Sequence, residues 1–171
     1  MKQCKIVVTG PESTGKSTLS KALAQAFDAI WVPEYARKYL DQLNRPYQQQ
    51  DLLKIARGQV ESEYQLQQQA SINICDTDLT VIKIWSEYKY GNCHPWINEH
   101  LRENRADLYL LSYPDLAWEP DPQRENPLDR NELFDLYQSL LMDLQVEYKV
   151  IKGVGKERLD HAKRVVETKF F

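Results

Sequence analysis

Short, mostly apolar runs alternate along this chain with longer segments in which apolar residues recur every three or four positions. The short runs have the length of buried strands, and the longer segments have the period of helices that bury one face. Strands are predicted at 5–8, 29–32, 71–75, 107–113 and 146–151. Helices are predicted at 19–27, from Pro33 onward, and at 48–69, 79–90, 95–104, 128–142 and 156–168. This alternation predicts an α/β sandwich of three layers, with about five parallel strands and helices on both faces.

The segment 114–130 interrupts the pattern. It holds four prolines and many charged residues, a composition typical of a loop. With 171 residues, the chain has the length of one domain, 1–171, with a substantial core. We call 114–130 the lid loop, because a mobile loop after the fourth strand would lie over the carboxyl edge of the sheet, where ligands bind in such folds.

The turn after the first predicted strand matches the phosphate-binding pattern G-x-x-x-x-G-K-[ST]. In such a loop successive backbone N–H groups point at phosphate oxygens, Lys16 reaches the outer phosphates, and the Ser17 hydroxyl binds magnesium. The motif has the strand before it and the helix after it that this function requires, which favours a P-loop NTPase-type fold over a surface turn that merely contains glycine. We predict ATP and Mg²⁺ as ligands. The nucleotide-binding residues are Gly10, Glu12, Ser13, Thr14, Gly15, Lys16, Ser17 and Thr18.

Acidic residues follow two further strands and would reach the same edge of the sheet. Asp76, at the end of an apolar strand, suits a supporting role for magnesium, although Asp76 or Asp78 could equally cap the next helix. Glu34 stands where a carboxylate can accept a proton from a substrate hydroxyl as general base. Its alternative interpretation is a first-turn acid favoured by the helix dipole.

Two arginines and two aromatic residues complete the candidate site. Arg124 and Arg130, in and just after the lid loop, are candidates for stabilising transition-state charge and excluding water, although single arginines are more often solvated. Trp85 and Tyr88 can stack on a flat ring, but aromatic residues at helical spacing more often belong to the core.

Composition excludes several other classes of protein. The formal net charge is −3, so no basic excess indicates a nucleic-acid partner. No apolar run approaches the length of a transmembrane helix, and the chain enters a strand at once, so we expect a cytoplasmic protein without a membrane partner. The three cysteines lack C-x-x-C spacing and are expected to be reduced thiols. The oligomeric state is left open.

These residues together resemble the ribosylnicotinamide kinase domain of bacterial NAD-salvage proteins. The resemblance extends over nearly the whole chain, and its most specific stretches follow the phosphate loop. They are Val32-Pro33-Glu34-Tyr35-Ala36-Arg37, Cys75-Asp76-Thr77-Asp78-Leu79-Thr80 and Ile84-Trp85-Ser86-Glu87-Tyr88.

The resemblance implies an ATP-dependent kinase that phosphorylates the ribose 5′-hydroxyl of nicotinamide riboside and makes nicotinamide mononucleotide. It implies that Glu34 or Asp76 orients the acceptor hydroxyl, that Arg37 contacts the substrate, and that Trp85 contacts the nicotinamide ring. Asp78 and Tyr88 are assigned to the substrate as well. The two loop arginines match the family's lid.

The sequence departs from the best-known members of this family, in which a nucleotidyltransferase domain precedes the kinase. Its three histidines form no H-x-G-H motif, so adenylyl transfer is not assigned. Two alternatives stay open: a kinase for another nucleoside or nucleotide, and a non-kinase P-loop ATPase or regulatory switch that hydrolyses ATP without an acceptor.

Overall fold

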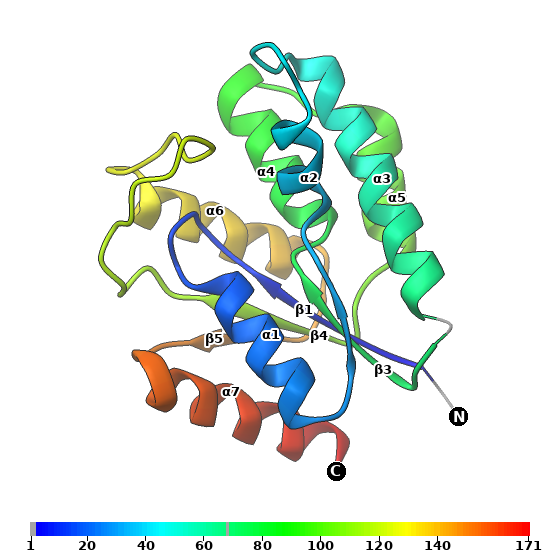
Figure 1. Ribbon diagram of the computed structural model, residues 1–171, viewed down its shortest axis with the longest axis vertical. Coiled ribbons are helices and arrows are strands. Elements are labelled where there is room, and N and C mark those ends of the chain that lie inside the picture. Colours follow the sequence, from blue (N-terminus) through cyan, green and yellow to red (C-terminus); the bar gives the residue numbers. More distant parts are fainter. Residues whose placement is uncertain (1–2, 68) are drawn as a thin grey trace.

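A single parallel sheet organises the protein. The computed structural model describes residues 3–67 and 69–171. Within them, five strands form one sheet in the order β2-β3-β1-β4-β5, with every neighbouring pair parallel. Figure 1 shows the sheet between its helices. The strands are β1 (Cys4–Thr9), β2 (Ile30–Val32), β3 (Ile72–Asp76), β4 (Leu108–Ser112) and β5 (Tyr148–Ile151).

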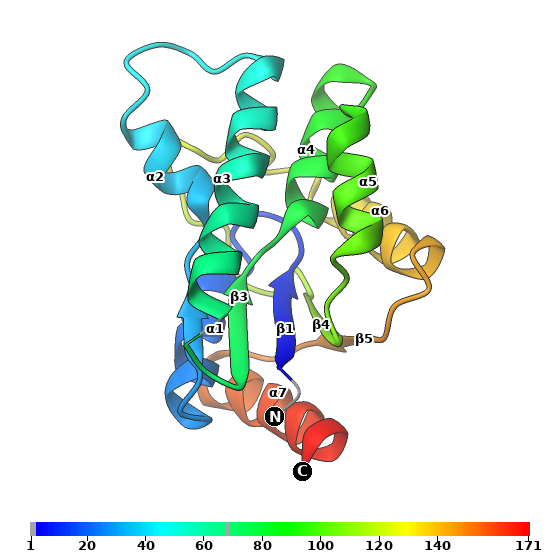
Figure 2. The same ribbon diagram turned by 90° about the vertical axis from the view of Figure 1, so that its right-hand side faces the viewer.

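The helices cover both faces of the sheet, as the alternation of elements predicts (Figure 2). They are α1 (Lys16–Ala26), α2 (Tyr35–Asp41), α3 (Gln49–Gln67), α4 (Leu79–Tyr90), α5 (Pro95–Glu103), α6 (Arg130–Asp143) and α7 (Gly155–Phe170). Helices α1 and α7 bury one apolar cluster against the sheet, and α2 to α6 bury a larger one against the other face. The prediction of a three-layer α/β sandwich is confirmed.

Element ends differ from the predicted ones by a few residues. β5 begins at Tyr148, because 146 and 147 still belong to the connection that follows α6, and α6 begins at Arg130, because the lid loop extends to that point. The predicted end of the 48–69 helix includes residue 68, which lies outside the described residues. Within the described part of the chain, no helix has both the length and the apolar character needed to cross a bilayer.

A close approach between β1 and β4 fixes the start of the phosphate loop. Gly10 follows β1 directly and adopts φ 134°. A Cβ on this residue would lie 2.9 Å from the carbonyl oxygen of Ser112. Both the backbone angle and the spacing therefore require glycine, because an L side chain would be strained and would collide with β4. The loop can then turn immediately at the carboxyl edge of the sheet.

A second close approach lies between α2 and α3. Tyr35, the first residue of α2, packs its ring directly on Gly58 of α3, where an added Cβ would lie 2.1 Å from the ring atom Cε1. The two helices can meet at this distance because α3 has no side chain at this point. Glu34, one of the predicted site residues, immediately precedes Tyr35.

We predict that Gly58→Ala destabilises the protein. At an open helical position this change stabilises by about 1 kcal/mol through helix propensity. Here the added methyl group overpacks the contact with Tyr35, which costs about 1–3 kcal/mol. Urea unfolding should show a lower midpoint for Gly58→Ala, while Gln65→Ala, on the exposed side of the same helix, stays near the parent protein. A Gly58→Ala variant as stable as the parent would contradict the close contact.

Candidate active site

The phosphate loop curls around an open helix end. α1 begins at Lys16, and among the described residues no side chain caps its amino terminus. The loop is braced from within, because the Thr14 hydroxyl donates to the Pro11 carbonyl oxygen over 2.8 Å. Lys16 Nζ donates to the same oxygen over 2.7 Å. Free amides at a helix amino terminus, next to a lysine, form a binding site for phosphate.

A cavity of about 890 Å³ opens in front of this loop. It lies between the phosphate loop, α2, α4, the lid loop and the start of α7. Most of the residues predicted for the site line it: Gly10, Glu12, Ser13, Thr14, Gly15, Lys16, Ser17, Thr18, Glu34, Arg37, Trp85, Tyr88 and Arg124. A volume of this size is in the range of small-molecule and nucleotide sites.

Two carboxylates and one ammonium group share the inner end of the cavity. Burial raises the pKa of Glu34, and the positive charge of Lys16 opposes this shift. Burial likewise raises the pKa of Asp76, opposed by a hydrogen bond with Ser17 and by the charge of Lys16. For Lys16, burial lowers the pKa and the two carboxylates oppose it. Each charge is therefore costly alone; Lys16 stabilises both carboxylates and is stabilised by them, whereas Asp76 disfavours charge on Glu34.

Asp76 and Ser17 fit the donor set of a magnesium site. Asp76 is buried at the end of β3 behind the lining of the cavity, and its side chain is hydrogen-bonded with Ser17. Its Oδ1 atom is buried and has no partner among the described residues. A carboxylate and a hydroxyl are the hard oxygen donors that Mg²⁺ takes, together with phosphate oxygens and water.

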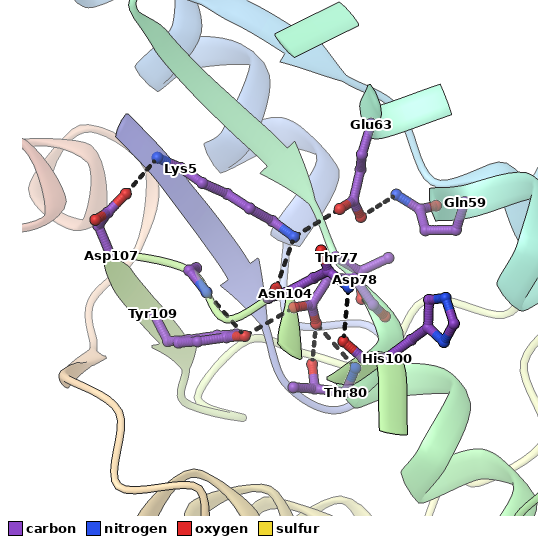
Figure 3. A network of polar contacts seen from close by, with 11 residues as sticks. Lys5, Gln59, Glu63, Thr77, Asp78, Thr80, His100, Asn104, Asp107 and Tyr109 are labelled. Carbon is purple, nitrogen blue, oxygen red and sulfur yellow. Dashed lines mark hydrogen bonds and ion pairs between the residues drawn. The ribbon is translucent and has the colours of Figure 1, made fainter. Parts of the chain in front are cut away.

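Asp78 is not part of the cavity, and its assignment to the substrate is corrected. It caps α4: Oδ1 accepts from the Thr80 backbone N–H over 2.9 Å and from the Thr80 hydroxyl over 2.6 Å. Its other oxygen accepts from the Tyr109 hydroxyl over 2.9 Å. Figure 3 shows this buried network under α4. Both carboxylate oxygens thus have partners within the protein, and the helix cap is Asp78 rather than Asp76.

The lid loop is bound to the phosphate loop. The Glu12 carboxylate accepts the backbone N–H groups of Glu125, over 3.0 Å, and Asn126, over 2.9 Å. The Ser13 hydroxyl accepts the backbone N–H of Glu119 over 2.9 Å. Glu12 and Ser13, both predicted to bind nucleotide, therefore also hold the loop that covers the nucleotide site.

The lid loop is also bound to the other wall of the cavity. Arg37 on α2 forms an ion pair with Asp121 at 2.7 Å. The Tyr47 hydroxyl donates to Glu125 over 2.5 Å, and Lys89 on α4 pairs with the same carboxylate at 2.8 Å. The loop thus bridges the phosphate side and the α2–α4 side of the cavity, as expected for a lid.

The two predicted lid arginines have different positions. Arg124 lines the cavity and donates to the Ser13 hydroxyl over 3.4 Å and to the Glu119 carbonyl oxygen. Arg130 does not line it. Its Nη1 donates to the backbone carbonyl oxygens of Ser13, over 3.1 Å, and Leu116, over 2.9 Å. Arg130 therefore holds two backbone segments together, and its role in stabilising transition-state charge stays a prediction.

The aromatic wall of the cavity comes from α4. Trp85 and Tyr88 both line the space opposite the phosphate loop. The Trp85 indole N–H donates to the Tyr47 hydroxyl over 2.9 Å, and the two rings meet edge to face with centroids 4.8 Å apart. These contacts fix the orientation of the indole ring beside the cavity.

Arg158 was not predicted, yet it organises the site. It is buried in the first turns of α7 and donates to the carbonyl oxygens of Thr14 over 2.6 Å, Gly153 over 2.7 Å and Tyr113 over 2.9 Å. It also forms an ion pair with Asp115. Its guanidinium group joins the phosphate loop to the ends of β4 and β5. The sequence signal is weak: an arginine shortly after the turn 153–155.

Comparison with known proteins agrees with this geometry. A family model described as "AAA domain" matches residues 5–158. The Trifunctional NAD biosynthesis/regulator protein NadR of Escherichia coli (strain K12) is 28% identical over 152 residues. That alignment covers 84% of this chain and 37% of the relative, so the chain spans less than half the relative's length.

Solved structures show the same fold. Two crystal structures of NadR, in complex with NR and with NAD and AMP-PNP, give TM-scores of 0.84 and 0.82 at 22% identity. Both matches cover 98% of this chain. They cover 51% of the NadR chain in the complex with NR and 49% of the NadR chain in the complex with NAD and AMP-PNP. A thymidylate kinase from Ehrlichia chaffeensis gives a TM-score of 0.68 at 15% identity over 96% of this chain and 100% of its own. The predicted P-loop kinase-like fold is confirmed.

The contacts of Glu12 predict a measurable effect on the lid loop. Hydrogen bonds to a charged group contribute about 1.5–3 kcal/mol, so Glu12→Ala should raise amide hydrogen exchange at 125 and 126 by about tenfold or more. Glu12→Gln keeps one accepting oxygen and should give an intermediate rate. Amides of α5, remote from the lid loop, serve as the internal control. Unchanged exchange at 125 and 126 in Glu12→Ala would show that Glu12 does not hold the loop.

Proposed function

The chain belongs to the AAA domain family, and from that premise we propose that it is an ATP- and Mg²⁺-dependent kinase for nicotinamide riboside. It transfers a phosphoryl group to the ribose 5′-hydroxyl and releases nicotinamide mononucleotide, a step of NAD salvage. The observation that carries the proposal is the grouping of Lys16 and Glu34 in one cavity next to an open phosphate loop, with Asp76 behind the lining and near enough to interact with both.

The phosphate loop supports the nucleotide half of the reaction. Backbone amides at the start of α1 would bind the β- and γ-phosphates of ATP, and Lys16 would exchange its Pro11 partner for phosphate oxygen. Ser17 and Asp76 would hold Mg²⁺, which neutralises charge on the phosphates when bound. Arg124, at the cavity wall, would add positive charge to the transferred group.

The acceptor half uses the buried carboxylates. The riboside 5′-oxygen attacks the γ-phosphorus, the bond from that phosphorus to the β–γ bridging oxygen breaks, and ADP leaves. The hydroxyl proton goes to a carboxylate, for which Glu34 and Asp76 are the two candidates. Glu34 lines the cavity and its side chain is 20% exposed, whereas Asp76 lies deeper and is hydrogen-bonded with Ser17. We therefore assign Glu34 as the base.

Comparison with the NadR complexes supports the choice of substrates. One of those proteins was solved with NR and one with the ATP analogue AMP-PNP together with NAD. In the present chain, Arg37 and the ring of Trp85 flank the acceptor side of the cavity, where ribose and a flat pyridine ring would lie. The lid loop, held by Glu12 and Arg37, would exclude water from the transferred phosphate.

The direct test is ADP and product formation with ATP, Mg²⁺ and a panel of acceptors: nicotinamide riboside, nicotinic acid riboside, adenosine, uridine and thymidine. We expect acceptor-dependent ADP formation that is fastest with nicotinamide riboside, and chromatography should identify the mononucleotide. Faster turnover of another nucleoside would reassign the substrate. ADP formation that no acceptor increases would instead indicate an ATPase or a nucleotide switch.

Lys16→Ala should abolish most of the turnover and leave the fold intact. The lysine acts on phosphate charge that develops during transfer, and losing one such group typically costs about 10²–10³-fold in kcat. Circular dichroism and urea unfolding of the variant provide the control for folding. A loss of less than about tenfold would show that the loop does not serve catalysis.

The raised pKa of Glu34 predicts the acid side of the pH–rate profile. A base must be deprotonated, so kcat/KM should fall as pH decreases through a pKa above the ordinary value of about 4.3 for Glu. Glu34→Gln should lower kcat strongly, change ATP binding little, and remove this limb of the profile. If Glu34→Gln keeps both turnover and the limb while Asp76→Asn loses them, Asp76 is the base.

A further inference from the structure

The amino end of α2 is capped by another helix rather than by its own cap residue. Glu34 occupies the N-cap position with extended backbone angles, φ −64° and ψ 113°, but its side chain makes no cap hydrogen bond among the described residues. The first backbone N–H of the helix, on Tyr35, donates instead to Oε1 of Gln59 on α3 over 2.9 Å. An N-cap side chain accepts the N–H of the second or third residue of its helix, so the first N–H, on Tyr35, needs an acceptor from elsewhere. Gln59 supplies it.

The amide of Gln59 has one orientation available. Its Nε2 donates over 3.0 Å to Oε1 of Glu63, and Oε2 of that carboxylate pairs with Lys5 Nζ at 2.6 Å. Figure 3 shows this row of side chains from Lys5 to Gln59. Because the carboxylate paired with Lys5 accepts hydrogen bonds, the NH₂ group of Gln59 must face Glu63 and its oxygen must face Tyr35. Gln59 is 1% exposed, so water does not compete for these bonds.

The same place on α3 fixes the ring of Tyr35. Gly58, the neighbour of Gln59, leaves the space that the tyrosine ring fills. The backbone and the side chain of the residue after Glu34 are thus both held by two consecutive residues of one helix. A carboxylate attached one residue earlier has little freedom in where its Cα lies.

We propose that Gln59 is a positioning residue for Glu34. By accepting the Tyr35 N–H, it fixes the backbone of the residue that follows Glu34 and so holds the Glu34 carboxylate where it lines the cavity. The role rests on the proposed function, in which Glu34 takes the proton of the acceptor hydroxyl. Gln59 itself does not line the cavity and touches no reacting atom.

Removing the Gln59 amide predicts a specific change in Glu34. In Gln59→Leu the Tyr35 N–H loses its acceptor and the start of α2 is released, so the Glu34 carboxylate can turn to accept the N–H of Ala36 or Arg37, as an N-cap side chain does. A carboxylate that accepts backbone N–H groups is stabilised in its charged form, so its pKa falls. It becomes a weaker base and turns away from the acceptor. A displacement of about 1 Å at a reacting group can cost about 10²-fold in rate.

The experiment uses the whole chain with ATP, Mg²⁺ and nicotinamide riboside. For Gln59→Leu we expect kcat to fall by about tenfold to a hundredfold, with the KM for ATP within about threefold of the parent. The acid limb of kcat/KM should shift to lower pH by about one unit. Gln65→Leu is the matched control, the same substitution on the exposed side of α3, and should match the parent in all three quantities.

A rescue variant separates positioning from a general loss of structure. The double substitution Gln59→Glu with Glu63→Gln exchanges the two side chains. The carboxylate at 59 can still accept the Tyr35 N–H, and the amide at 63 can still donate to residue 59 and accept from Lys5.

This double variant should restore kcat to within about threefold of the parent and the acid limb to within a few tenths of a pH unit. Urea unfolding of each variant reports its stability separately from its rate.

Two outcomes overturn the proposal. One is Gln59→Leu with parental kcat and an unmoved acid limb. The other is a lower kcat with an unmoved acid limb and no recovery in the double variant, which would assign Gln59 to packing alone. If Gln59→Leu does not fold, the double variant tests the proposal instead. A folded double variant then overturns it if kcat differs from the parent by more than about threefold, or if the acid limb differs by more than a few tenths of a pH unit. Absence of acceptor-dependent turnover in the parent protein would be a failure of the proposed function itself, visible before any variant is made.

Discussion

The site depends on the balance of charge around Lys16. One ammonium group and two carboxylates would each be unfavourable alone, because removal from water opposes charge on all three. Lys16 stabilises the charge of both carboxylates, and the carboxylates of Glu34, Asp76 and Glu12 stabilise the charge of Lys16, whereas Asp76 and Glu12 both disfavour charge on Glu34. The sheet brings them together: Lys16 follows β1, Glu34 follows β2 and Asp76 ends β3, and parallel strands place these ends at one edge.

The lid loop is held by many contacts that are individually weak. Arg37 with Asp121 and Lys89 with Glu125 are partly exposed ion pairs, and such pairs contribute about 0–1 kcal/mol each. The contacts at the base of the loop are stronger, since the buried guanidinium group of Arg158 binds three backbone carbonyl oxygens and Asp115. A loop with a firm base and weak outer contacts can open for substrates and close again without rearranging the fold.

The sequence was sufficient for the fold and for half of the site. Apolar periodicity located every strand and helix to within a few residues, because burial of one face dictates that periodicity. The phosphate loop was readable because its chemistry lies in consecutive residues. Asp78 was misassigned because proximity to Asp76 in the chain does not show which way a side chain points: Asp78 turns under α4 to Tyr109. The position of Arg130 in the sequence likewise does not show its partners, which are backbone carbonyl groups remote in the chain.

The residues that sequence reasoning missed share one property: they hold backbone rather than substrate. Arg158 fixes the phosphate loop through Thr14, and Gln59 fixes the start of α2 through Tyr35. These partners, Thr14 and Tyr35, are bonded through main-chain atoms, which leave no residue-type signature in the sequence. Because Glu34 is one residue from Tyr35, the bond from the Tyr35 N–H to α3 fixes the backbone next to this carboxylate. In the proposed mechanism the position of the base therefore depends on hydrogen bonds in which its own side chain takes no part.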